Sequence, residues 1–330
     1  MKKWMKLAAV TVASTAMLAA CGKSGDEGKS GSGEKEYTIG ATQIVEHPSL
    51  DAAYQGFKDA LKDKGLKVKY DFQSAQNDQN NVSTISNNFV SKQVDLIFAN
   101  STPSALGALQ ATKDIPIVFT SVSDPVGAGL VKSKEKPGGN ITGVIDLHPD
   151  AIKKTIEFID DNFKNAKVGL LYNAGEQNSV TQIKTLEDLA KGSNVKFVKR
   201  TVANSSEVQQ AANTLVGKAD VIYIITDNTV VSALDSVVKV ANDQKIPLIV
   251  GEPDSLKKGG FATYGIDFHT IGYRSGEMAA EILKGEKKPG DIAIENPPEL
   301  KLFINKEAAD KQGVKWNEKW DKDAEIINKK

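Results

Sequence analysis

Hydrogen-bonding and acidic side chains gather just after the apolar stretches that we predict as strands. Gln43 and His47 follow the first stretch, and Ser101, Asp227 and Glu252 follow later ones. Carboxylates can bind an ammonium group, whereas hydroxyls and the free N–H groups of helix N-termini can bind a carboxylate. These segments contain no Lys or Arg, which disfavours a phosphate or dicarboxylate ligand. The pattern therefore favours a zwitterionic ligand.

Many of these polar residues also have a purely structural interpretation. Ser49, Thr102, Ser179 and Asn228 precede predicted helices, where a side-chain oxygen can accept from free backbone N–H groups. For any single residue, helix capping alone explains its position. The ligand hypothesis depends on the whole set, which comes from both halves of the chain.

The sequence lacks the combinations that other functional classes require. No cluster around His47, His148 or His269 has metal-ligand spacing, so we expect neither a metal nor a cofactor. Gly138-Gly139 lacks the strand-to-helix context of a phosphate loop, and no nucleophile–base pair indicates an enzyme. The 42 basic and 42 acidic residues form no basic stripe, which argues against nucleic-acid binding.

Strands and amphipathic helices alternate along the chain, which predicts parallel sheets covered by helices. In the first half we expect strands at 37–42, 67–72, 95–99 and 115–120, and helices at 50–64, 79–92 and 103–113. The second half repeats this order, with strands at 167–172, 195–198, 221–225 and 247–250 and helices at 180–191, 206–217 and 229–242. Each half also carries Ser-Ala-Leu followed by Ile-Pro. We therefore predict an α/β protein with two Rossmann-like lobes, in which ligands bind at the carboxyl ends of the strands.

Three short segments are predicted to cross between the lobes. They are Ile145–His148, Ile266–His269 and Asn296–Pro298. The N-terminal lobe then consists of 37–145 plus 268–296, and the C-terminal lobe of 146–267 plus 297–330. Three crossings would make a hinge.

The first 36 residues have the features of a targeting signal followed by a flexible tether. Lys2, Lys3 and Lys6 precede a 12-residue apolar run, which is too short to span a bilayer and is typical of a signal peptide covering 1–20. The run ends in Leu-Ala-Ala-Cys-Gly, which resembles a bacterial lipobox in which Cys21 is lipidated. The following Gly/Ser/charged stretch to Glu36 is predicted to be a flexible tether.

An ordered series of motifs resembles the ABC transporter substrate-binding proteins related to the tryptophan/tyrosine importers of Gram-positive bacteria. The series comprises 43–51 with Gly56-Phe57, 115–120, 124–126, 137–143, 172–173, 176–179 and 227–228, and the resemblance extends from about Tyr37 to Gly313. It implies a type I periplasmic-binding-protein fold, an amino acid ligand that is often aromatic, and partner permease and ATPase subunits. It also implies a monomer on the extracellular face of the membrane, held by the lipid anchor.

Carried onto this sequence, the resemblance implies a set of cleft-lining residues. They are Gln43, His47, Asn77, Ser101, Thr102, Thr120, Glu176, Asn178, Asp227, Asn228 and Glu252. Asp227 is our first choice for the ammonium contact, because it follows a buried strand and precedes a helix. Phe119, Tyr172, Tyr264 and Phe268 lie near strand ends and could contact a ligand ring, but each also fits plain core or hinge packing.

Alternatives to amino-acid capture remain open at the sequence level. A sugar-binding protein has the same fold, although such sites usually include an Arg, which the predicted cleft lacks. A surface hydrolase would need a nucleophile–base pair. An adhesin or a ligand sensor without a permease would leave no readable signature in the sequence.

Overall fold

The computed structural model describes residues 35–327. Cys21, the predicted signal peptide and most of the predicted tether lie outside the described residues. Within the described range, no helix combines the length and the apolar character needed to cross a bilayer.

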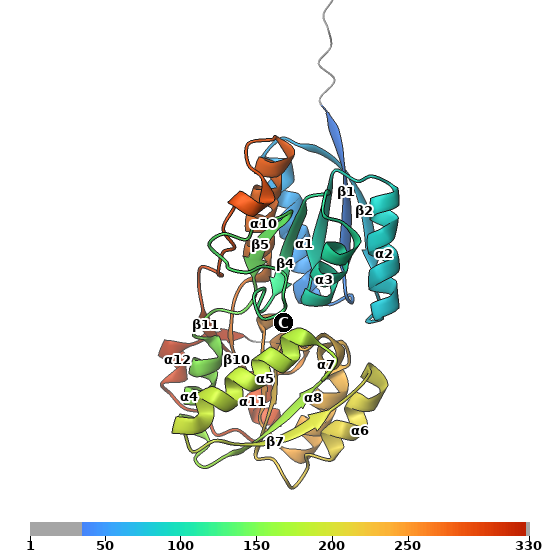
Figure 1. Ribbon diagram of the computed structural model, residues 1–330. Helices are drawn as coiled ribbons and strands as arrows, with labels where there is room; N and C mark the ends of the chain where they lie inside the picture. Colours follow the sequence, from blue (N-terminus) through green and yellow to red (C-terminus); the bar gives the residue numbers. More distant parts are fainter. Residues whose placement is uncertain (1–34, 328–330) are drawn as a thin grey trace, which may run out of the picture. The chain divides into compact units, whose positions relative to one another are not determined.

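The first sheet is wholly parallel and has the order β2-β1-β3-β4-β5 (Figure 1). Its strands are β1 (Glu36–Gln43), β2 (Lys67–Ser74), β3 (Leu96–Asn100), β4 (Ile117–Val122) and β5 (Ile141–Ile145). In β3, Leu96 and Phe98 point to one face and Ile97 to the other, because side chains alternate along a strand. All residues of β3, β4 and β5 are buried, which explains why these segments are continuous apolar runs.

Two pairs of helices cover this sheet. Helices α1 (Pro48–Asp63) and α10 (Phe268–Leu283) cover one face, and α2 (Gln79–Ser91) and α3 (Thr102–Ala111) cover the other. The α1–α10 contact requires glycine, because a Cβ on Gly272 would lie 1.9 Å from the carbonyl oxygen of Ala53. This close approach ties a late helix of the chain to the first.

The second sheet has the order β12-β11-β10-β9-β8-β6-β7. Its strands are β6 (Lys167–Tyr172), β7 (Lys196–Thr201), β8 (Val221–Ile224), β9 (Leu248–Val250), β10 (Ala262–Gly265), β11 (Lys301–Asn305) and β12 (Glu325–Ile327). The pairing of β10 with β11 is antiparallel, unlike the wholly parallel sheet that we predicted. The chain leaves the sheet at Gly265 and re-enters it after α10 at Lys301, which lies opposite Gly265, so β11 runs back along β10.

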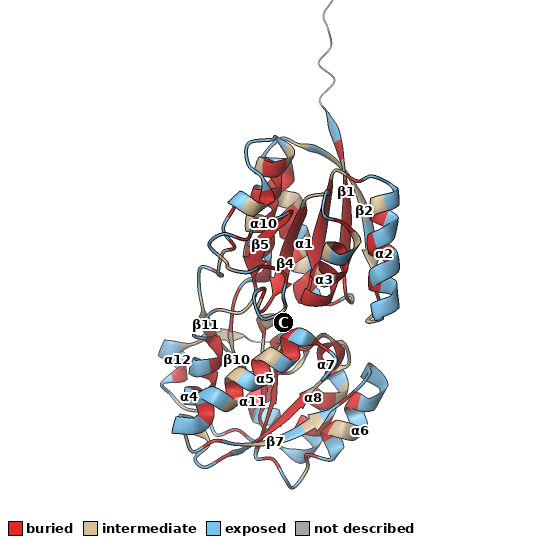
Figure 2. Cartoon of the chain, viewed as in Figure 1, coloured by how far each residue is buried: buried red, intermediate tan, exposed pale blue. Residues whose placement is uncertain are grey.

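Helices also flank the second sheet on both faces. Its helices are α4 (Ala151–Asn162), α5 (Gln177–Leu189), α6 (Val208–Asn213), α7 (Asn228–Ser232), α8 (Leu234–Gln244), α9 (Pro253–Lys258), α11 (Lys306–Lys311) and α12 (Trp320–Asp323). Apolar residues of α4 and α5 share one core cluster, and those of α6, α7 and α8 share another. Figure 2 shows buried residues concentrated in the strands and exposed ones on the outer sides of the helices. The chain thus forms two α/β lobes with largely parallel sheets, as we predicted.

Several elements differ from the sequence predictions. The single helix predicted at 229–242 is divided into α7 and α8, because Ala233 has φ −114° and ψ 24°. Helices α4 and α9 were not predicted at all. The chain passes between the two sheets after Ile145, after Gly265 and before Lys301.

Candidate ligand-binding cleft

Polar loops at the carboxyl ends of the first sheet adopt unusual backbone conformations. Asn77, Ser101 and Ser121 have φ values of 63°, 143° and 57°. A positive φ costs energy for residues with a Cβ, and such residues concentrate at ligand sites that the surrounding structure holds in place. These conformations mark the strand ends as a candidate functional surface.

A pocket lies where the strand ends of the two sheets face each other. The space between the atoms that enclose it is about 430 Å³, which includes the part open to solvent. Among the described residues that line it, none is Lys or Arg. The lining residues are Val45, His47, Ser49, Leu50, Ser121, Asp146, Asn178, Thr226, Asp227, Asn228, Val231, Glu252 and Phe268.

The sequence-predicted residues divide into two groups in the structure. His47, Asn178, Asp227, Asn228 and Glu252 line the pocket. The other six are not among its lining residues: Gln43, Asn77, Ser101, Thr102, Thr120 and Glu176. The structure therefore brings five of the eleven predicted residues together at one pocket.

Among these six residues, Gln43 links α1 to β3 through its side-chain amide. Gln43 Nε2 donates to Asp51 Oδ1 at 2.8 Å, and its Oε1 accepts from Asn100 Nδ2. The hydroxyls of Thr102 and Thr120 are buried and have no hydrogen-bond partner among the described residues.

Glu176 supports the start of α7. Its carboxylate accepts from the backbone N–H groups of Asn228 and Thr229, at 3.1 and 2.9 Å, and from both of their side chains. A helix N-terminus favours a negative charge at this position. Glu176 therefore orients α7 from behind the pocket wall.

Several predicted ligand residues act as helix N-caps. The side chains of His47, Ser101, Asp227 and Glu252 accept from the first turns of α1, α3, α7 and α9. The predicted caps Ser49, Thr102 and Asn228 therefore lie one or two residues beyond the true ones. Ser179 is also not a cap, because α5 begins after Glu176, whose side chain makes no cap bond. The structural and ligand-binding interpretations thus apply to the same side chains.

Asp227, the predicted ammonium contact, already accepts three hydrogen bonds from the protein itself. Its Oδ2 accepts from Asn173 N at 2.6 Å and Ser179 Oγ at 2.7 Å, and its Oδ1 accepts from Val230 N at 2.8 Å. Burial, reinforced by the neighbouring Glu176 carboxylate, raises the pKa of Asp227 to about 7. Its geometry is that of a residue that holds the loop together at the pocket wall.

Asp146, which the sequence analysis treated only as part of a crossing, has a free oxygen at the pocket. Its Oδ1 is inaccessible to solvent and has no hydrogen-bond partner among the described residues. Burial raises the pKa of Asp146 to about 6, although a contact with Ser123 opposes this shift. The signal was present in the sequence, because Asp146 directly follows β5 as the other polar residues follow their strands.

Asn178 presents a second free acceptor to the pocket. Its Nδ2 donates to the carbonyl oxygen of Thr226 at 3.0 Å and lies 3.4 Å from Glu176 Oε2. These acceptors fix the orientation of the amide. Its Oδ1 is buried without a partner among the described residues.

His47 presents a donor to the same pocket. Its Nδ1 accepts from the backbone N–H of Ser49 at 3.3 Å, so the proton of the neutral ring is on Nε2. Burial lowers the pKa of His47, an effect that the Glu252 carboxylate partly opposes, and the ring is therefore neutral at pH 7. Nε2 has no hydrogen-bond partner within the described part of the chain.

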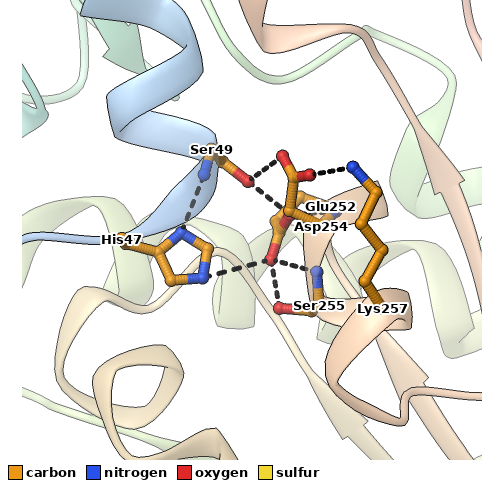
Figure 3. Close-up of polar contacts among 6 residues, drawn as sticks. All are labelled: His47, Ser49, Glu252, Asp254, Ser255 and Lys257. Carbon is orange, nitrogen blue, oxygen red and sulfur yellow. Dashed lines mark hydrogen bonds and ion pairs between the residues drawn. The ribbon is translucent and has the colours of Figure 1, made fainter.

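Hydrogen bonds connect the two lobes around the pocket. Ser49 Oγ lies 2.5 Å from Glu252 Oε2 and 2.9 Å from Asp254 Oδ2 (Figure 3). Gln182 Nε2 donates to Ser123 Oγ at 3.3 Å, and Asn77 Nδ2 donates to Thr229 Oγ1 at 3.0 Å. These contacts join strand ends that are distant in the sequence.

One of the four candidate ring contacts lines the pocket. Phe268 does so at the start of α10, beside the apolar side chains of Leu50 and Val231. Phe119 is fully buried in the first lobe. Tyr172 and Tyr264 pack against the core of the second lobe. Among the described residues, no group of acidic, His or Cys side chains could hold a metal ion.

Comparisons with known proteins agree with this architecture. Residues 38–327 match the model of the family described as ABC transporter substrate binding protein. The chain is 46% identical to a "Tyrosine-binding protein" of Clostridioides difficile (strain R20291), an alignment that covers 93% of this chain and 91% of that one.

Two solved structures are informative about the arrangement of the lobes. A structure of an ABC domain in complex with L-Trp from Streptococcus pneumonia is 35% identical, with a TM-score of 0.84. The ligand-free, open structure of a substrate binding protein with adhesive properties from Clostridium difficile is 40% identical, with a TM-score of 0.66. Each match covers 89% of this chain and 100% of the other. The more similar sequence thus has the less similar structure.

Proposed function

We propose a ligand for this protein from one premise, which is that the chain belongs to the family of ABC transporter substrate-binding proteins. It is the substrate-binding component of such a transporter. The proposed ligand is an L-amino acid with an aromatic side chain. The partners that follow from this assignment are a permease and an ATPase.

The observation that carries the proposal is the polarity of the pocket. Asp146 Oδ1 and Asn178 Oδ1 are buried acceptors without partners among the described residues. A buried acceptor without a donor costs free energy, so a ligand that supplies donors is favoured. An ammonium group supplies three, and its positive charge also favours the ionised form of Asp146.

The remaining wall of the pocket suits an apolar side chain. Val45, Leu50, Val231 and Phe268 line it. A relative named as tyrosine-binding and a related structure that contains L-Trp support an aromatic side chain at this position. Aromatic rings gain both from burial and from edge or stacked contacts with Phe268.

Closure of the lobes is the proposed response to the ligand. The bonds from Ser49 and Asn77 to the opposite lobe exist only where the two sets of loops meet. The better match to the L-Trp complex than to the open, ligand-free structure supports a closed arrangement of the two lobes. A ligand can favour closure only by as much as its affinity for the closed form exceeds that for the open form.

The remaining features of the proposal concern location and assembly. Substrate-binding proteins of ABC importers are extracellular or periplasmic. We propose that lipidation of Cys21 holds this one on the outer face of the cell membrane as a monomer. We also propose that it converts no substrate, as is usual for substrate-binding proteins.

Isothermal titration calorimetry of the purified protein with the twenty L-amino acids, several sugars and nucleosides tests this function. At least one aromatic L-amino acid is expected to bind with one-to-one stoichiometry. When the free concentration of this ligand is 100 times its dissociation constant, the free energy of unfolding should rise by about 2.7 kcal/mol. N-acetylation of the same amino acid removes the ammonium charge and should abolish binding. Binding of a sugar alone, or of the N-acetyl derivative as tightly as the parent, would refute the proposal.

A further inference from the structure

The pocket contains a buried donor that the proposed ammonium and apolar contacts leave unused. His47 Nε2 and Glu252 Oε1 are 3.7 Å apart, which is too long for a hydrogen bond (Figure 3). Their side chains are only 5% and 4% exposed. Both residues line the pocket, so a ligand atom there can contact His47.

The direction of this donor is fixed by the fold. Because Nδ1 accepts from Ser49 N at the start of α1, the ring cannot reverse its tautomer without losing the cap of that helix. Nε2–H therefore remains a donor at the pocket wall, on the side that faces Glu252 Oε1, and an acceptor on the ligand would satisfy it (Figure 3). An ammonium group or an indole N–H cannot, because neither has a free lone pair.

The charges around His47 decide which kind of acceptor fits. The pKa of the His47 ring is raised by the negative charges of Glu252, Asp254 and Asp51 and lowered by the positive charge of Lys258. The Glu252 carboxylate is already held by Ser255, by the backbone N–H of Asp254 and by Ser49. A ligand carboxylate would be repelled by these acidic groups, whereas a neutral hydroxyl oxygen would not.

The position of His47 separates this donor from the acceptors proposed for the ammonium group. His47 follows β1 and Asp146 follows β5, and β3 and β4 lie between those strands in the sheet. The two residues therefore approach the pocket from different strands. A tyrosine carries its hydroxyl at the far end of the ring from its ammonium group, so one such ligand offers polar groups to two separate parts of the pocket.

We propose that His47 is a specificity-determining residue whose Nε2–H donates to the phenolic hydroxyl of a bound tyrosine. This inference rests on the proposed function and narrows it. Phenylalanine leaves the buried donor unsatisfied, and tryptophan presents an N–H group that cannot accept. The protein should therefore bind tyrosine more tightly than either of the other aromatic amino acids.

Calorimetry with Tyr, Phe and Trp on the wild-type protein and two variants tests the inference. In the wild type, Tyr should bind at least about tenfold more tightly than Phe and Trp, because an unsatisfied buried donor costs about that much or more. His47→Asn keeps an acceptor near the Nδ1 position, and Asn is a favoured N-cap, but the distal donor is lost. This variant should lose about ten- to a hundredfold in affinity for Tyr and less than about threefold for Phe.

His47→Gln is the matched control, because its amide N–H can reach the distal position while the cap is lost. It should retain the preference for Tyr over Phe even if it is less stable. Equal affinities for Tyr and Phe in the wild type, or an equal loss of both in His47→Asn, would overturn the inference and leave the proposed function standing. Failure of all three aromatic amino acids to bind would overturn both. If His47→Asn does not fold, the wild-type series and His47→Gln still decide the matter.

Discussion

Replacing Asp146 with Asn should weaken ligand binding and change its dependence on pH. The substitution keeps the shape of the side chain but removes the negative charge from the pocket. A hydrogen bond between charged groups contributes about 1.5–3 kcal/mol, so the dissociation constant at pH 8 should rise roughly 10- to 150-fold. The loss follows from the free, buried Oδ1 of Asp146 that we assign to the ammonium group.

The pH dependence supplies an independent measure of the same contact. Burial raises the pKa of Asp146 to about 6 in the ligand-free protein, so the carboxylate is charged above pH 6 and protonated below it. Wild-type affinity should be constant above about pH 7.5 and fall by up to about tenfold per pH unit below 6. In Asp146→Asn the component that Asp146 contributes near pH 6 should be absent, and any residual dependence would come from the other buried titratable groups of the pocket, His47 and Asp227.

Calorimetric titrations at half-unit steps from pH 5 to pH 8 would measure both effects. Asp150→Asn is the matched control, because Asp150 lies on the same connection between β5 and α4 but is exposed and makes no side-chain cap bond. That variant should bind like the wild type at every pH. An Asp146→Asn protein with wild-type affinity, or with an unchanged midpoint near 6, would show that Asp146 does not contact the ammonium group.

Three further perturbations follow from the structure. Ser49→Ala removes a hydroxyl that contacts Glu252 across the lobes. Ligand affinity should therefore fall several-fold, while the melting temperature of the ligand-free protein changes little. An unchanged affinity in calorimetry would contradict this prediction. Gly272→Ala forces a Cβ into the backbone of α1, so the free energy of unfolding measured in urea should fall by at least about 2 kcal/mol. For the control Gly192→Ala, where a Cβ would meet open space, that free energy should change by less than about 0.5 kcal/mol. Burial raises the pKa of Asp227 to about 7, so the folded protein binds a proton that the unfolded chain releases above about pH 4. The free energy of unfolding of the ligand-free protein should therefore fall as pH rises from 5 to 7.5, and a thermal-unfolding series showing the reverse would argue against the buried acid.

The sequence by itself determined the order of strands and helices and the end of each strand at which polar residues gather. These features come from local periodicity. Strand β3, for example, is readable as a short apolar run because both of its faces are buried. Helix α4 shows that the same signal can be overlooked, because Ile152, Ile156 and Ile159 have helical spacing and yet the helix was not predicted.

Only the tertiary structure decided which strand-end residues share the pocket and which of their atoms are free. Asp227 and Asp146 both follow strands, and no local pattern distinguishes them. Folding brings three protein donors to Asp227, whereas Asp146 Oδ1 receives none from the described residues. Likewise, Ser49 and Glu252 are 203 residues apart in the chain and meet only when the lobes face each other. Hydrogen-bond satisfaction depends on every neighbour in space, so it cannot be read from the spacing of residues along the chain.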